Sequence, residues 1–152
     1  MEYGETMKYL LITLNNEQWW IELNNDNCAV RQIVLDHFGI IHMSCFEDCL
    51  AEEPIDFADL EGAITIITKE KFQSFWYSLI NNHIEKWNET KKKYPLNCYI
   101  FGVCRYFYPQ GIIITGCDYI ALYIGEQKIK IHQSIMAKVI KYDDLNMWLI
   151  CN

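Results

Sequence analysis

The 152-residue chain has few of the residues that mark unusual protein classes. Its three prolines are scattered and its seven glycines are isolated, which excludes a phosphate-binding glycine loop and a low-complexity linker. No stretch approaches the ~18 consecutive apolar residues of a membrane span. The first residues, Met1 to Thr6, carry acids where a signal peptide carries positive charge. We therefore expect an unexported, cytoplasmic protein with no membrane association.

Cysteines are present but odd in number, and most of them lie inside apolar runs. The seven are Cys28, Cys45, Cys49, Cys98, Cys104, Cys117 and Cys151. In a reducing compartment such thiols behave as small hydrophobic side chains. We therefore expect free cysteines, with a disulfide framework as the less favoured alternative.

The composition is that of a globular protein, with 51% hydrophobic and 22% charged residues and a net charge of −7. The charge is uneven: 16 acids and 8 bases precede Pro95, whereas 4 acids and 5 bases follow Tyr94. Between Cys45 and Glu61 there are seven acids and no base. A field of this sign repels phosphate backbones and attracts basic proteins.

The first part of the chain predicts an antiparallel β-meander followed by one long helix. Short apolar or alternating runs separated by asparagine turns predict strands at 10–14, 19–23, 29–36, 40–43 and 63–67. Thr68 is a good N-cap, and Pro95 ends the helical pattern. From residue 72 the apolar side chains recur at helical spacing, at Phe72, Trp76, Leu79, Ile80, Ile84 and Trp87.

The second part is nearly all strand. Apolar runs bounded by turn signals predict five strands at 98–107, 112–115, 119–124, 137–142 and 147–151. Five short strands at regular spacing are typical of a small β-barrel. The fold class is therefore α+β, with one domain at 1–94 and a second at 95–152.

Two segments of the second part carry a recognisable pattern, the stretch from Phe101 to Thr115 and the closing hairpin from Ala137 to Ile150. They resemble the RNA-binding OB-fold motif of ribosomal protein S-one. The resemblance implies a five-stranded OB-like barrel with a nucleic-acid site of Arg105, Tyr108, Tyr123, Lys138 and Lys141. Ile113 replaces the second aromatic of the motif, and Tyr123 replaces its histidine, so only part of the stacking platform is kept.

The first part contains five short motifs, Trp20-Ile-Glu-Leu23, Val30-Arg-Gln-Ile33, Gly39, Glu53-Pro-Ile55 and Ile67-Thr-Lys-Glu-Lys-Phe72. With these motifs it resembles small acidic α+β proteins of bacteria, many of which are immunity proteins of toxin systems. The resemblance implies a non-enzymatic, antitoxin-type protein that neutralises a basic toxin, for example a nuclease. The residues expected to contact the toxin are Glu47, Asp48, Glu52, Glu53, Asp56 and Asp59.

Ordinary packing accounts for the candidate catalytic and metal-binding residues better than a site does. His42, Cys45 and Cys49 have the ligand types of zinc but lack a fourth ligand nearby. The four histidines are scattered, so no cysteine has an evident base, and acids in a polar loop are usually solvated. We therefore predict no catalytic residue, metal or cofactor. Trp19 and Trp20 must point to opposite faces of one strand, so we expect one of them either to be exposed, as an aromatic anchor for a partner, or to lie under a second layer of structure.

Overall fold

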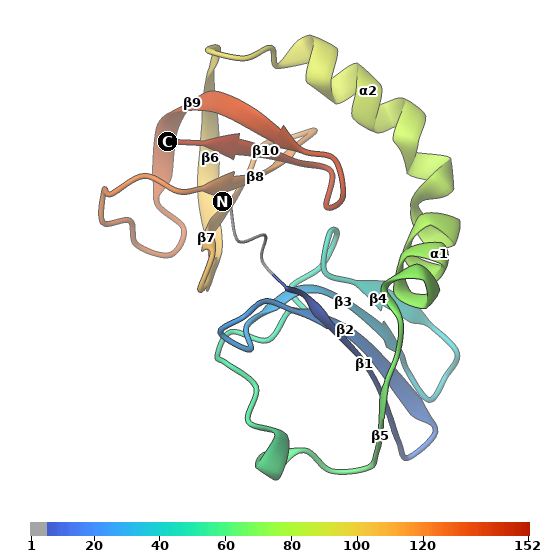
Figure 1. Ribbon diagram of the computed structural model, residues 1–152. Coiled ribbons are helices and arrows are strands. Elements are labelled where there is room, and N and C mark those ends of the chain that lie inside the picture. The colour runs from blue at the N-terminus through green and yellow to red at the C-terminus, as the bar shows by residue number, and fades with distance from the viewer. Residues whose placement is uncertain (1–5) are drawn as a thin grey trace. The chain divides into compact units, whose positions relative to one another are not determined.

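The computed structural model describes residues 6–152, and the predicted α+β class is confirmed. The chain forms two compact units, one ending at Ile80 and the other beginning at Asn81 (Figure 1). No helix within the described residues is long and apolar enough to cross a membrane.

The first unit is built on an antiparallel sheet of five strands in the order β4-β3-β2-β1-β5. The strands are β1 (Lys8–Leu14), β2 (Glu17–Leu23), β3 (Ala29–Leu35), β4 (Ile41–Met43) and β5 (Ala63–Ile66). β1 to β4 follow one another as the predicted meander, and β5 returns to pair with β1. The β1–β2 hairpin turns at Asn15 and Asn16, whose φ angles of 51° and 64° suit asparagine.

One face of this sheet is covered by α1 (Lys69–Ile80). Thr68 accepts a hydrogen bond from the Lys71 N–H at 3.2 Å, which confirms it as the cap. The helical segment continues through a 3₁₀ turn, η2 (Asn81–His83), into α2 (Ile84–Lys93). The change from α-helical to 3₁₀ geometry falls at two adjacent asparagines, Asn81 and Asn82. Asparagine side chains compete with the backbone for helical hydrogen bonds.

A buried ion pair lies under α1. Tyr9, Glu22 and Arg31 are cross-strand neighbours on the helix-facing side of the sheet. Arg31 donates two hydrogen bonds to Glu22 at 2.7 and 2.8 Å, and a third to Gln73 at 2.8 Å. Burial, and then Glu22, raise the pKa of Tyr9 to about 12. All three guanidinium nitrogens thus donate a hydrogen bond, which compensates for burial of the charge.

The second unit is a closed ring of five strands, in the order β10-β8-β7-β6-β9. The strands are β6 (Tyr99–Tyr108), β7 (Gly111–Thr115), β8 (Ile120–Tyr123), β9 (Ser134–Asp143) and β10 (Trp148–Cys151). Every neighbouring pair is antiparallel except β8 and β10, which run parallel. The five predicted strands are all present, and the fourth begins three residues before its predicted start.

The ring is filled by apolar side chains, and α2 contributes to this core through Trp87, which is 6% exposed. The Trp87 indole donates to Asp144 at 2.8 Å, and the Tyr142 hydroxyl donates to the Tyr94 carbonyl oxygen. The division between units therefore falls at Ile80 and Asn81 rather than at the predicted 94/95. Periodicity along the helix could not reveal which core its last turns join.

Candidate interaction surface

The acidic segment, residues 44–62, lies on the face of the first sheet opposite α1. Gln32 points to this face, and its side-chain oxygen accepts the Ala51 N–H at 3.2 Å. The Ile55 N–H donates to the Asn27 carbonyl oxygen at 2.8 Å, and Leu50 is 4% exposed. The segment has little regular structure beyond the 3₁₀ turn η1 (Phe57–Asp59), yet hydrogen bonds and one buried leucine hold it to the sheet.

The six acids predicted to contact a partner are all exposed: Glu47, Asp48, Glu52, Glu53, Asp56 and Asp59. Asp56 caps η1 by accepting the Ala58 N–H at 2.9 Å. Within residues 6–152, Glu52, Glu53 and Asp59 form no ion pair with a lysine or arginine. These carboxylates therefore face solvent with their charge uncompensated by a neighbouring cation.

A small pocket opens where the acidic segment returns to the sheet. Its volume is about 220 Å³, and it is lined by Ile12, Leu14, Trp19, Asp59, Leu60 and Glu61. The lining combines apolar side chains, an indole ring and two exposed carboxylates. Such a pocket suits a lysine or arginine side chain, whose stem is apolar and whose head is cationic. Glu61 was not among the residues predicted to contact a partner, although it is the last acid of the acidic run in the sequence.

Gly62 allows the segment to approach β1 closely enough to form this pocket. Its φ is +93°, and a Cβ at this position would lie 2.5 Å from the Thr13 carbonyl oxygen. A glycine is needed both for the positive φ and for the close contact. The chain then enters β5 beside β1.

His42 ties the start of the acidic segment to the preceding turn. Its Nδ1 lies 2.7 Å from Glu47 and its Nε2 lies 2.9 Å from Asp36. Hydrogen bonding to Asp36, and then to Glu47, raises the pKa of His42. His42 in turn lowers the pKa of Asp36. Two carboxylates around one imidazole favour its charged form.

The three candidate zinc ligands, His42, Cys45 and Cys49, are not placed to hold one metal ion. Both ring nitrogens of His42 are engaged by carboxylates. Burial raises the pKa of the Cys49 thiol to about 12, which opposes the thiolate that a metal needs. In the part of the chain that the structure describes, no group of three His, Cys, Asp or Glu side chains is placed to hold a metal.

Of the two alternatives for the adjacent tryptophans, exposure as an anchor or cover by a second layer, the structure shows cover. Trp19 and Trp20 do point to opposite faces, but both are half-buried. Trp20 packs on Phe75 of α1 with ring centroids 4.6 Å apart, and Trp19 forms one wall of the small pocket. Both faces of the sheet are covered, so neither indole is left in solvent.

The residues predicted for nucleic-acid binding do not form one platform. Tyr108 and Tyr123 are only 7% and 6% exposed, so neither ring offers a face for stacking. Arg105 and Lys141 are exposed and Lys138 is half-buried. The two tyrosines were predicted to face outward, because alternation in the sequence does not show which side chains of a strand point into the closed sheet.

The outer wall of the ring carries a different aromatic patch. Tyr99 and Phe101 are 64% and 72% exposed, and they pair across the strands with Lys138 and Met136. In the sequence Tyr99 and Phe101 alternate with Ile100 and Cys104, but only the structure shows that the latter two lie inside the ring.

Comparisons with protein-family models, with curated proteins and with solved structures find no match to this chain.

Proposed function

We propose that this protein is a non-enzymatic, cytoplasmic inhibitor that binds a basic protein through the acidic segment, as an immunity protein binds its toxin. The pocket bordered by Asp59 and Glu61 carries the proposal, because its apolar floor and paired carboxylates suit a partner's lysine or arginine. The other exposed acids of the acidic segment extend the negative surface of the same unit.

The charge of the first unit supports the same conclusion. Up to Ile80 the chain has 14 acids and 4 bases, a net charge of −10, whereas the remainder has a net charge of +3. A field concentrated in this way accelerates encounter with a basic partner and fixes its orientation. A basic nuclease is the example that fits best, since its substrate site is itself built to attract negative charge.

The test compares two variants with the same change in net charge. The first carries Glu52→Lys, Glu53→Lys and Asp59→Lys, and the control carries Glu85→Lys, Glu89→Lys and Glu126→Lys, all exposed positions. A stoichiometric basic protein is first isolated from native lysate with the unaltered chain, and its affinity for each variant is measured. We expect the first variant to bind about 100-fold more weakly and the control to change only a few-fold.

Equal affinities of the two variants would show that overall charge alone attracts the partner. All six positions lie at the surface, so we expect both variants to fold, and thermal unfolding checks this. Binding by the native chain should also weaken as salt is raised.

A second candidate, single-stranded nucleic-acid binding, is favoured by the topology of the second unit. A five-stranded ring that closes between its first and fourth strands, with the third and fifth parallel, has the strand order of an OB barrel. The exposed Tyr99 and Phe101 would supply stacking faces, with Lys138, Arg105 and Lys141 near phosphates.

This candidate predicts that labelled single-stranded RNA binds at low salt and dissociates as salt rises. Phe101→Ala should weaken binding by about 1–3 kcal/mol, because stacking on one ring has that magnitude. Phe107→Ala, which removes another exposed ring of β6, is the control. Absence of RNA binding at low salt would remove the candidate.

A further inference from the structure

The strand β5 forms an open edge of the first sheet. It is the last strand in the sheet order and pairs with β1 (Figure 1). All four of its residues are exposed, with Ile64 at 39% and Ile66 at 80%. The acidic segment leads directly into it.

The hydrogen-bond pattern shows which backbone groups point outward. The Ile67 N–H donates to the Tyr9 carbonyl oxygen at 3.0 Å, and the register pairs Thr65 with Leu11. In an antiparallel ladder, alternate residues bond to the same neighbour. Ala63 and Thr65 therefore bond toward β1, while Ile64 and Ile66 direct their N–H and carbonyl groups to the open side.

Of the features that usually prevent strand addition, this edge lacks charge, proline and a bulge. Proteins protect edges with charges, proline, bulges or very short strands. At the opposite edge, β4 has three residues and its central His42 is held by two carboxylates. β5, by contrast, reads Ala-Ile-Thr-Ile, without charge or proline.

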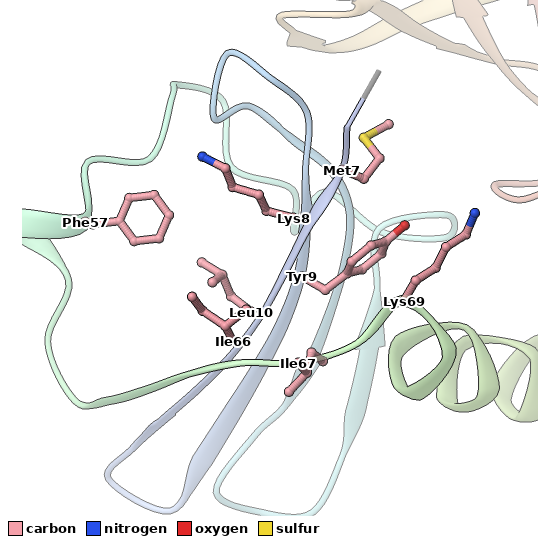
Figure 2. A pocket seen from close by; sticks show the side chains of 8 residues that line it. All are labelled: Met7, Lys8, Tyr9, Leu10, Phe57, Ile66, Ile67 and Lys69. Carbon is pink, nitrogen blue, oxygen red and sulfur yellow. The ribbon is translucent and has the colours of Figure 1, made fainter. Parts of the chain in front are cut away.

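A largely apolar pocket of about 600 Å³, with Lys8 and Lys69 also in its lining, lies beside this edge. Ile66 is the register partner of Leu10, so both side chains lie on the face opposite α1. Figure 2 shows Phe57 on one side of the pocket and Leu10 and Ile66 on the other. An added strand would project alternate side chains toward this pocket, which is how strand addition achieves specificity.

Charge along the edge distinguishes its two ends. Asp59 and Glu61 precede β5, whereas two lysines, Lys8 and Lys69, line the pocket beside its other end. A complementary strand is therefore basic at the end beside Glu61 and apolar at the end beside Ile66. A second copy of this chain fits less well, since two units of net charge −10 would be brought together.

We propose that the edge of β5 binds an extended segment of the basic partner as a sixth strand of the sheet. This inference rests on the proposed function and adds the mode of recognition. Backbone bonds to Ile64 and Ile66 supply affinity, the apolar pocket accepts a side chain, and Asp59 and Glu61 hold the basic end.

The test uses the full chain and a synthetic probe, a seven-residue peptide of alternating valine and threonine with two arginines at one end. Nuclear magnetic resonance follows the backbone amides during titration. We expect the Ile64 and Ile66 amides to shift and to exchange more slowly with solvent when the peptide binds. The same peptide with glutamates in place of the arginines should have no effect.

Two substitutions at one position separate the backbone from the side chain. Ile66→Pro removes the outward N–H and leaves the β1 ladder intact, because this N–H does not bond to β1. Ile66→Thr removes apolar surface but keeps the N–H. We expect Ile66→Pro to weaken peptide and partner binding about tenfold more than Ile66→Thr does.

The outcomes separate the inference from the proposed function. If Ile66→Pro binds the partner as tightly as the native chain does, while the Glu52, Glu53 and Asp59 variant does not bind, the function stands and strand addition is excluded. If the same amides become protected on concentrating the protein alone, the occupant is a second copy and the inference is overturned. If no basic protein or peptide binds the native chain, both proposals fail.

Discussion

The two units solve the edge problem of β-structure in different ways. In the second unit five strands close on themselves, and each strand has two neighbours. In the first unit the sheet stays open, with β4 and β5 at its edges. Closure leaves a β-structure only its side chains for recognition, whereas an open sheet also presents backbone hydrogen-bonding groups. The acids gather on the unit that keeps an open edge.

The cores differ as well. The ring encloses a continuous apolar cluster that includes Ile114, Val139 and Leu149. The sheet of the first unit instead buries Arg31 and Glu22 beneath α1. A buried ion pair is costly to desolvate but stabilises one arrangement of partners once formed. The first unit should therefore be far more sensitive to loss of a single charge.

The largest expected effect comes from breaking that pair. Arg31→Met leaves the Glu22 carboxylate, 6% exposed, without its partner. We expect the first unit to lose about 3–5 kcal/mol of unfolding free energy. Urea unfolding combined with hydrogen exchange should show the first unit opening at lower denaturant, while amides of the ring keep their protection.

The double variant Arg31→Met with Glu22→Leu is the control, and it should recover much of the loss because no unpaired charge remains. A single transition shifted equally in both units would contradict the independence of the two cores.

The next effect concerns the turn that brings the acidic segment to β5. Gly62→Ala must adopt a φ of +93° with its Cβ near the Thr13 carbonyl oxygen, so we expect a loss of about 1–3 kcal/mol. Gly39→Ala is the matched control, because its φ is +81° but nothing lies within 4 Å of the added Cβ. Chemical denaturation of both should show the smaller loss for Gly39→Ala; equal losses would mean that the close contact is relieved.

A smaller effect is expected in the second unit. Trp87→Phe keeps an aromatic ring in the core but removes the indole N–H that donates to Asp144. We expect a loss of about 0.5–1.5 kcal/mol, the usual net value of one hydrogen bond. Asp144 keeps its bond to Lys91 at 2.8 Å, which limits the damage. A loss comparable to that of Arg31→Met would show that the ring depends on this bond.

The smallest effect is a pH dependence at His42. Because its folded-state pKa is raised above 6.5, its stabilisation is fully present below pH 6.5 and is lost as pH rises through the folded pKa. Asp36 acts oppositely: its pKa is lowered from 3.8, so its contribution is lost as pH falls through the lowered value. The melting-temperature difference between the native chain and His42→Gln should therefore shrink as pH rises above 6.5.

Asp36→Asn is the companion variant, because asparagine keeps the acceptor oxygen that caps the Phe38 and Ile40 N–H groups. It should remove much of the His42 dependence, since Asp36 is the first cause of the raised pKa. An unchanged profile would assign the dependence to another group.

Local patterns in the sequence were sufficient for most elements. Alternation and turn residues placed all ten strands within a few residues, and helical spacing with Thr68 placed the helical segment. The 3₁₀ turn at Asn81–His83 was missed because the apolar spacing passes through it unchanged. The candidate surface was found only in part: the six acids are exposed, but the pocket also brings Glu61 beside Ile12 and Trp19 of the first hairpin, which are distant from it in the chain.

The sequence by itself determined the α+β class, the order of the elements and the concentration of acids before β5, because propensity, periodicity and charge are local properties. Only the tertiary structure decided that Tyr108 and Tyr123 are buried and that Ile64 and Ile66 present an open edge. It also decided that the carboxylates of Asp59 and Glu61 border the small pocket beside Trp19. These features depend on long-range register and on which face of each strand meets a neighbour. Pairing between strands distant in sequence sets both.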